Sequence, residues 1–197
     1  MSFPTCFKKV MMKKLISIFL LCLSTQAMAL ELEGVVLADK IQLGNATLQL
    51  NGVGLRTKLF FKVYVGALYL GEKKRTTSAV LADVGAKRVT MHMLRELSSE
   101  KLLEAFDKGL ASNSTPAELA AIAAHIKEFS AIFQIAKQVE KGDVITLDYF
   151  PGEGTRVSIN GVEKGRVAGP EFNRALLKIW LGDDPVAEDL KKGLLGG

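Results

Sequence analysis

The longest β-type run in the chain spans residues 53–71, with the sequence VGLRTKLFFKVYVGALYLG. It is rich in Val, Phe, Tyr and Leu, which are residues that favour strands. Because side chains alternate between the two faces of a strand, odd and even positions are considered separately. The odd positions are almost all apolar, which predicts that this face lies on a core. The even positions begin with Arg56 and Lys58 and end with Leu70, so this face changes from basic to apolar along the run.

Two interpretations of the even face remain open. A basic end that leads into an apolar trough is suited to an amphiphile with an acidic head group. Alternatively, the run is an edge strand whose lysines face water and discourage pairing with other chains.

Shorter strands are expected on both sides of this run. Residues 32–37 predict one strand, and Gly44-Asn45 is a hairpin turn between strands at 41–43 and 47–50. Asn51-Gly52 is a second turn signal, directly before the long run. Further strands are predicted at residues 87–94, 144–149, 156–159 and 162–167, with Asn160-Gly161 as the two-residue turn between the last two.

Helical spacing and capping residues predict the remaining elements. Thr115 is an N-cap, Pro116 fits the first helical position and Glu118 completes a capping box, so a helix should run from here to about Val139. Other helices are expected over residues 77–84, over 100–110 with Ser98 or Ser99 as the cap, from Pro170 to Trp180, and from Asp184-Pro185 to about Leu195. This order of elements predicts one α+β domain with a largely antiparallel sheet.

The first 29 residues differ in composition from the rest. Four lysines precede the apolar run 15–23, and Ala27-Met28-Ala29 has the small-x-small pattern of a cleavage site. We therefore expect a secretory signal peptide at 1–29, a mature domain at 30–197, secretion across the inner membrane and a periplasmic location. The apolar run is too short for a good membrane span, so no stable span is expected after cleavage. Met11 and Met12 are alternative start sites to Met1.

Removing this segment changes what the composition implies. The whole chain has 26 Lys and Arg against 21 Asp and Glu, whereas the part after residue 29 has 22 against 21. The basic excess thus belongs to the signal peptide and is no indication of a nucleic-acid partner. Cys6 and Cys22 also leave with it, so the mature chain has no thiol for a disulfide, a metal site or a nucleophile.

The sequence lacks the patterns that mark several common nucleotide-binding, hydrolase and metal sites. There is no phosphate-binding loop, no dinucleotide fingerprint and no G-x-S-x-G elbow. His92 and His125 are 33 residues apart with no cysteine near them, which argues against a zinc site. Asp143 and Asp148 are interpreted as turn and solvent-face acids. No metal and no cofactor is expected, and no catalytic residue can be assigned.

The candidate ligand-binding residues are Arg56 and Tyr64. They are eight positions apart in the long run, an even number that places them on one face. Arginine carries a permanent charge and a fork of donors suited to a carboxylate or an oxyanion. Tyrosine adds one hydroxyl on an apolar body. Such a pair can hold the head of a fatty acid or polarise a carbonyl oxygen.

A set of motifs resembles the chalcone isomerase superfamily, and in particular its secreted bacterial branch. The matching segments are NGVGLRTKLFFKVYVGALYLG at 51–71, RVTMHMLRELSSEKL at 88–102, Gly142–Tyr149, Gly154-Thr155, Asn160-Gly161 and FNRALLKIWLGDDP at 172–185. The resemblance implies an open-faced β-sandwich, in which helices cover a large antiparallel sheet and a ligand cleft lies between them. Plant members of the superfamily close chalcones into flavanones, and a second group binds fatty acids without catalysis.

Both groups use an arginine on the early strand, and Arg56 matches it. The other family positions differ: the threonine falls on Tyr64, the tyrosine on Ser98 and the asparagine near Ala105. Tyr64 or Tyr149 is a candidate to replace the lost hydroxyl.

Three functions stay open. The first is a non-catalytic binder of a small apolar or fatty-acid-like ligand in the periplasm, and the second is an isomerase that acts on a chalcone-like or other carbonyl substrate. The third is an interaction protein of the cell envelope with no small ligand. The oligomeric state cannot be predicted.

Overall fold

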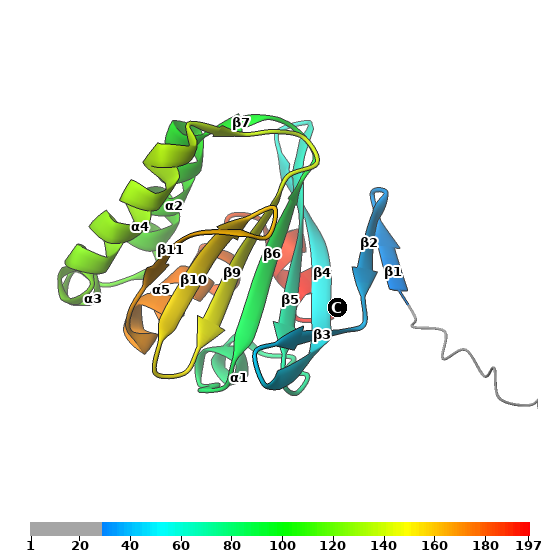
Figure 1. The fold of residues 1–197 in the computed structure, drawn as a ribbon, viewed down its shortest axis with the longest axis horizontal. Helices are drawn as coiled ribbons and strands as arrows, with labels where there is room; N and C mark the ends of the chain where they lie inside the picture. The colour runs from blue at the N-terminus through cyan, green and yellow to red at the C-terminus, as the bar shows by residue number, and fades with distance from the viewer. Residues whose placement is uncertain (1–28) are drawn as a thin grey trace, which may run out of the picture.

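The computed structural model describes residues 29–197, in which helices pack on one face of a large antiparallel sheet (Figure 1). In spatial order the strands are β11 (Val162–Val167), β10 (Gly154–Ile159), β9 (Val144–Phe150), β6 (Lys87–Met93), β5 (Phe61–Leu70), β4 (Ala46–Lys58) and β3 (Lys40–Leu43). The helices are α1 (Thr77–Leu81), α2 (Ser99–Asn113), α3 (Pro116–Ala121), α4 (Ala123–Ala136), α5 (Pro170–Leu181) and α6 (Glu188–Leu194). The predicted α+β class, an open-faced β-sandwich with a large antiparallel sheet covered by helices, is confirmed.

Two small pairs of strands complete the structure. β1 (Ala29–Leu32) pairs with β2 (Val35–Ala38), and this hairpin lies to the right of β4 in Figure 1. β7 (Leu97–Ser98) pairs with β8 (Gln138–Val139), which ties the start of α2 to the end of α4.

Both faces of β5 are buried, each in a different cluster. Of its even positions, Tyr64, Leu68 and Leu70 lie in the main core, between the sheet and the helices. Its odd positions from Val65 to Tyr69 lie in a second cluster with Leu37 of the β1–β2 hairpin. The odd face therefore does lie on a core, as predicted, but the larger core is on the even face.

The predicted strand boundaries need three corrections. Residues 53–71 are not one strand but two, because the chain turns at Leu59-Phe60 between β4 and β5. Residues 32–37 are likewise interrupted by a turn at Glu33-Gly34, where both residues have a positive φ. Asn51-Gly52 is not a turn and lies inside β4.

The helix predictions are largely confirmed. The capping box of Thr115 and Glu118 is present, and Ser98 caps α2. The helix expected from Thr115 to about Val139 is broken at Ile122, whose φ of −109° and ψ of 12° end α3 before α4 begins. The last helix starts at Glu188, later than its predicted start at Asp184.

The predicted signal peptide lies outside the described residues up to position 28, and Ala29 is the first residue of β1. Within residues 29–197, none of the helices has the length and apolar character needed to cross a bilayer.

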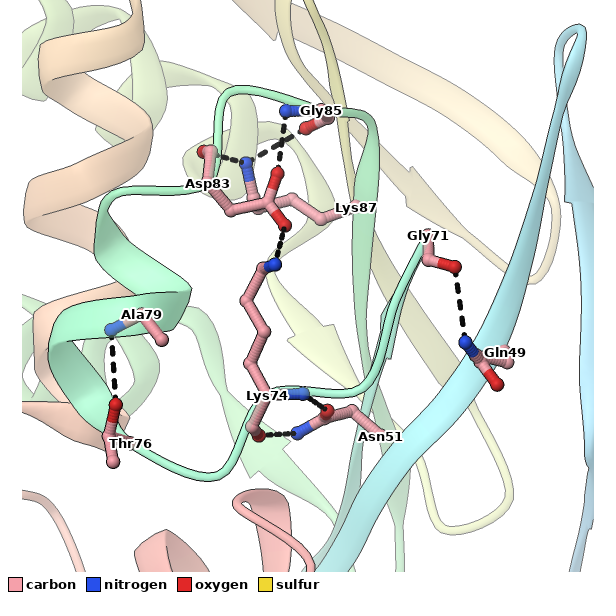
Figure 2. A network of polar contacts seen from close by, with 9 residues as sticks. All are labelled: Gln49, Asn51, Gly71, Lys74, Thr76, Ala79, Asp83, Gly85 and Lys87. Carbon is pink, nitrogen blue, oxygen red and sulfur yellow. Dashed lines mark hydrogen bonds and ion pairs between the residues drawn. The ribbon is translucent and has the colours of Figure 1, made fainter.

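A buried lysine stands at the start of β6 (Figure 2). Lys87 is only 3% exposed, and its Nζ donates to the carbonyl oxygens of Asp83 at 2.8 Å and Gly85 at 2.9 Å. Lys74 Nζ reaches the Asp83 carboxylate at 3.3 Å, while its backbone bonds the side chain of Asn51. Burial lowers the pKa of Lys87 to about 8, although the Asp83 carboxylate opposes that shift.

This lysine makes stability depend on pH. Between pH 8 and about 10.4, the reference pKa of a free lysine, the unfolded chain binds a proton at Lys87 that the folded chain has lost. Folding stability should therefore rise with pH in this window, by up to about 1.4 kcal/mol per pH unit. Urea unfolding of the wild type and of Lys87→Met measures this contribution as the difference between the two pH profiles. If the stability of Lys87→Met rises with pH between about 8 and about 10.4 as much as that of the wild type does, Lys87 does not cause the rise.

Candidate functional site

The β4–β5 hairpin brings Arg56 and Tyr64 face to face. Arg56 pairs directly with Tyr64 across the two strands, and its Cζ lies 5.5 Å from the centre of the tyrosine ring. The predicted shared face is thus correct, although the pair is adjacent on neighbouring strands and not eight residues apart on one strand. A register shift next to Arg56 makes this possible, because it leaves Val63 without a partner in the ladder and places Tyr64 opposite the arginine.

Tyr64 is buried and held in place by a helix. Its hydroxyl oxygen accepts a hydrogen bond of 2.8 Å from Nε1 of Trp180 on α5. Burial raises the pKa of Tyr64, while the weaker influence of Arg56 acts in the opposite direction. The phenol therefore keeps its proton at neutral pH, and that proton is available for a further acceptor.

Arg56 has donors that the described part of the chain does not use. Its Nε is buried and has no hydrogen-bond partner among residues 29–197. The ion pairs found in these residues do not include Arg56 either. Because a buried cationic donor without an acceptor is costly, this position favours an anion or a carbonyl oxygen beside the guanidinium.

Arg56 and Tyr64 line an apolar cavity of about 50 Å³ between the sheet, α2, α4 and α5. Three stacked or tilted phenylalanines form one wall, with ring centres 4.4 Å apart for Phe106 and Phe129 and 4.9 Å apart for Phe129 and Phe133. The remaining lining residues are Met91, Leu102, Leu103, Ala105, Leu147, Leu176, Ile179, Trp180 and Val186. This volume is below the roughly 300–1,000 Å³ of typical ligand sites.

Two further hollows adjoin this cavity, and both share Arg56 and Ala105 with it. One has a volume of about 260 Å³, and its charged lining residues other than Arg56 are Lys58, Lys101, Lys108, Glu104 and Asp184. The other has a volume of about 200 Å³ and includes Arg95. Arg56 therefore lies at the junction of an apolar cavity and two outer hollows in which basic side chains outnumber acidic ones. Ala105, near which the family asparagine is expected to fall, lines the cavity and both outer hollows.

The other residues considered from the sequence lie elsewhere. Tyr149 pairs with Lys87 near the opposite end of the sheet, so it does not replace a hydroxyl beside Arg56. Ser98 caps α2 through the backbone of Lys101. His92 is on β6, where burial lowers its pKa, and it does not line the cavity. Within residues 29–197 we find no cluster of side chains suited to a metal ion.

Sequence reasoning missed Trp180 as a partner of the site. It was placed only at the end of a predicted helix, since 116 residues separate it from Tyr64 and no local pattern links them. Phe129 and Phe133 lie within the helix predicted to start at Thr115, but no local pattern indicated that they surround a cavity.

Comparisons with known proteins agree with this architecture. A search of curated protein sequences finds no match. Among solved structures, the crystal structure of a fatty-acid binding protein from Arabidopsis thaliana has a TM-score of 0.64 and 17% identity. The match covers 85% of this chain and 96% of the plant protein, and at this identity it shows a shared fold. A family model described as chalcone isomerase-like matches residues 29–196. The chain therefore belongs to the chalcone isomerase-like family.

Proposed function

We propose that this protein binds a small amphiphilic ligand with an acidic head, such as a fatty acid, without converting it. The observation that carries the proposal is the unpaired Nε of Arg56, whose guanidinium carbon lies 5.5 Å from the centre of the Tyr64 ring, at the junction of an apolar cavity and mostly basic outer hollows. A carboxylate at this junction accepts hydrogen bonds from both side chains, and charge-assisted bonds of this kind are strong. The solved plant structure with the same fold is named a fatty-acid binding protein, which supports this class of ligand.

The apolar chain of such a ligand needs more room than the inner cavity offers. We propose that the head group lies at Arg56 and that the chain enters between the phenylalanines, whose side chains move apart to admit it. The outer hollows supply the path from the surface. The periplasm, after removal of residues 1–29, is the proposed place of action.

An isomerase would need to polarise a carbonyl and position a nucleophile. Among the described residues that line the inner cavity there is no carboxylate and no imidazole, so Arg56 and Tyr64 are the polar groups available beside the Trp180 indole. The small cavity volume instead favours an interaction protein as the second candidate, because side chains fill most of the space.

The test begins with solvent extraction of the purified protein and mass spectrometry of the extract. A fatty acid or other amphiphile in a one-to-one ratio supports the proposal. Arg56→Ala should then weaken binding of that ligand by about 10- to 100-fold, because a charged hydrogen bond contributes about 1.5–3 kcal/mol. Its fold should persist, since the Arg56 Nε has no partner in the described chain to lose.

The matched control is Arg174→Ala, which removes an exposed arginine of α5 that does not line the inner cavity. It should leave affinity unchanged. Equal affinity in Arg56→Ala and wild type would reject the site. A protein that carries no amphiphile and binds no fatty acid in titration would favour the interaction function.

A further inference from the structure

The tip of the β4–β5 hairpin exposes three consecutive large hydrophobic side chains. Leu59 is 82% exposed, Phe60 is 94% exposed and Phe61 is 58% exposed. The other exposed large hydrophobic residues of the described chain stand singly in the sequence. Isolated apolar residues are common on protein surfaces, whereas three consecutive exposed ones at the end of a hairpin indicate an interaction site.

The tip also has an unfavourable backbone. Leu59 adopts a φ of +55°, a conformation that a branched side chain rarely takes and that costs about 1 kcal/mol or more. The β10–β11 hairpin of the same sheet places Asn160-Gly161 at its turn, with φ values of 51° and 76°. Asparagine and glycine tolerate a positive φ, whereas leucine does not, so Leu59 does not suit the backbone geometry of its turn.

Cationic side chains surround the apolar tip. Lys58 and Lys62 flank it in sequence, and the Arg95 guanidinium lies 4.7 Å from the centre of the Phe61 ring. Lys62 is paired with Glu33 at 2.7 Å. The hollow beside the tip is lined by Leu59, Phe61, Arg56, Lys58, Arg95 and Lys101, with Glu96 as its one acidic residue.

We propose that this tip docks the protein on an anionic lipid bilayer, with Phe60 and Leu59 inserted into the interface and Lys58 and Arg95 facing the lipid head groups. A two-residue turn is too narrow for the roughly 1,200–2,000 Å² that a stable protein interface buries. Apolar insertion combined with basic residues is instead the combination that binds anionic membrane surfaces. Because Leu59 and Phe61 line the hollow that reaches Arg56, a docked tip sets the ligand site at the membrane.

This inference goes beyond ligand binding and does not rest on it. Flotation of the protein with vesicles measures docking directly. We expect binding to vesicles of equal parts phosphatidylglycerol and phosphatidylcholine, and much weaker binding to phosphatidylcholine alone. Lys58→Glu should lower the partition coefficient on the anionic vesicles by about tenfold or more, since each basic residue near the surface contributes about a fivefold effect.

The decisive variant combines Leu59→Asn with Phe60→Ser. It removes the exposed apolar side chains and relieves the unfavourable φ, so the protein should be at least as stable as the wild type while vesicle binding falls by about tenfold or more. Val84→Asn is the matched control, because Val84 is 80% exposed and precedes β6 at the end of the sheet opposite the tip. It should bind vesicles as the wild type does.

Two results would overturn the proposal. One is equal vesicle binding by the double variant and the wild type. The other is that the wild-type protein does not bind the vesicles but self-associates in sedimentation experiments, while the double variant stays monomeric. That second result would assign the tip to contacts between copies of the chain.

Discussion

Replacing Asp148 with Asn should lower the free energy of unfolding by about 2–4 kcal/mol. Asp148 is 1% exposed and lies between Arg88 of β6 and Arg156 of β10. One of its carboxylate oxygens accepts from Arg88 Nη2 at 2.8 Å and from Arg156 Nη2 at 2.9 Å, and the other accepts from Arg88 Nε. The uncharged amide leaves two arginines side by side without a counter-charge. Their side chains are 22% and 28% exposed, so water offsets part of this loss.

Urea unfolding measures the effect, and Asp107→Asn on the exposed surface of α2 is the control, with an expected change within about 0.5 kcal/mol. Adding Arg156→Gln to Asp148→Asn should recover part of the stability, because one of the two facing charges is removed. If the losses of stability in the two single variants, Asp148→Asn and Arg156→Gln, simply add in the double variant, the three residues do not act as a unit.

The interpretation of Asp148 as a solvent-face acid is wrong, because the residue is buried. Its position in the odd-even pattern was compatible with solvent, but its partners across the strands could not be identified without the register.

Local signals predicted local structure well. The capping box at Thr115 and the turn at Asn160-Gly161 depend on neighbouring residues alone, and both are confirmed. The turn at Leu59-Phe60 was missed, since leucine does not favour the positive φ that Leu59 adopts. The run 53–71 therefore looked like one continuous strand, and only pairing between β4 and β5 defines it as a hairpin.

The candidate site was predicted in part for a similar reason. Arg56 and Tyr64 were placed on one face by parity, and the register shift beside Arg56 preserves that relation across the turn. The contact from Trp180 and the phenylalanine wall depend on how α2, α4 and α5 pack on the sheet. No spacing along the chain encodes that packing. The role of Arg56 and Tyr64 as ligand-binding residues remains a prediction, which the extraction experiment and the Arg56→Ala variant test.

Adding a single methyl group at Gly52 should destabilise the fold by about 3 kcal/mol or more. A Cβ at this position would lie 2.1 Å from the carbonyl oxygen of Gly193 and 2.6 Å from that of Leu194. These are backbone atoms, so no side chain can rotate away and α6 itself must move off β4. Such a movement exposes Leu190 and Leu194, which are 0% and 2% exposed, and stretches the 2.7 Å bond from Asn51 to the Leu194 carbonyl.

The turn-like pair Asn51-Gly52 thus has a different physical role. The glycine lets a helix approach the strand backbone, and the asparagine bonds the end of that helix. Gly71→Ala is the matched control for Gly52→Ala, because a Cβ there meets nothing within 4 Å. Gly193→Ala makes the test sharper. Alanine favours helix by about 1 kcal/mol over glycine, yet a Cβ at Gly193 would lie 2.3 Å from the carbonyl oxygen of Val53. If Gly193→Ala stabilises the protein, direct contact between the backbones of α6 and β4 is not what holds this helix in place. If Gly193→Ala lowers the free energy of unfolding about as much as Gly52→Ala does, that contact is what holds it.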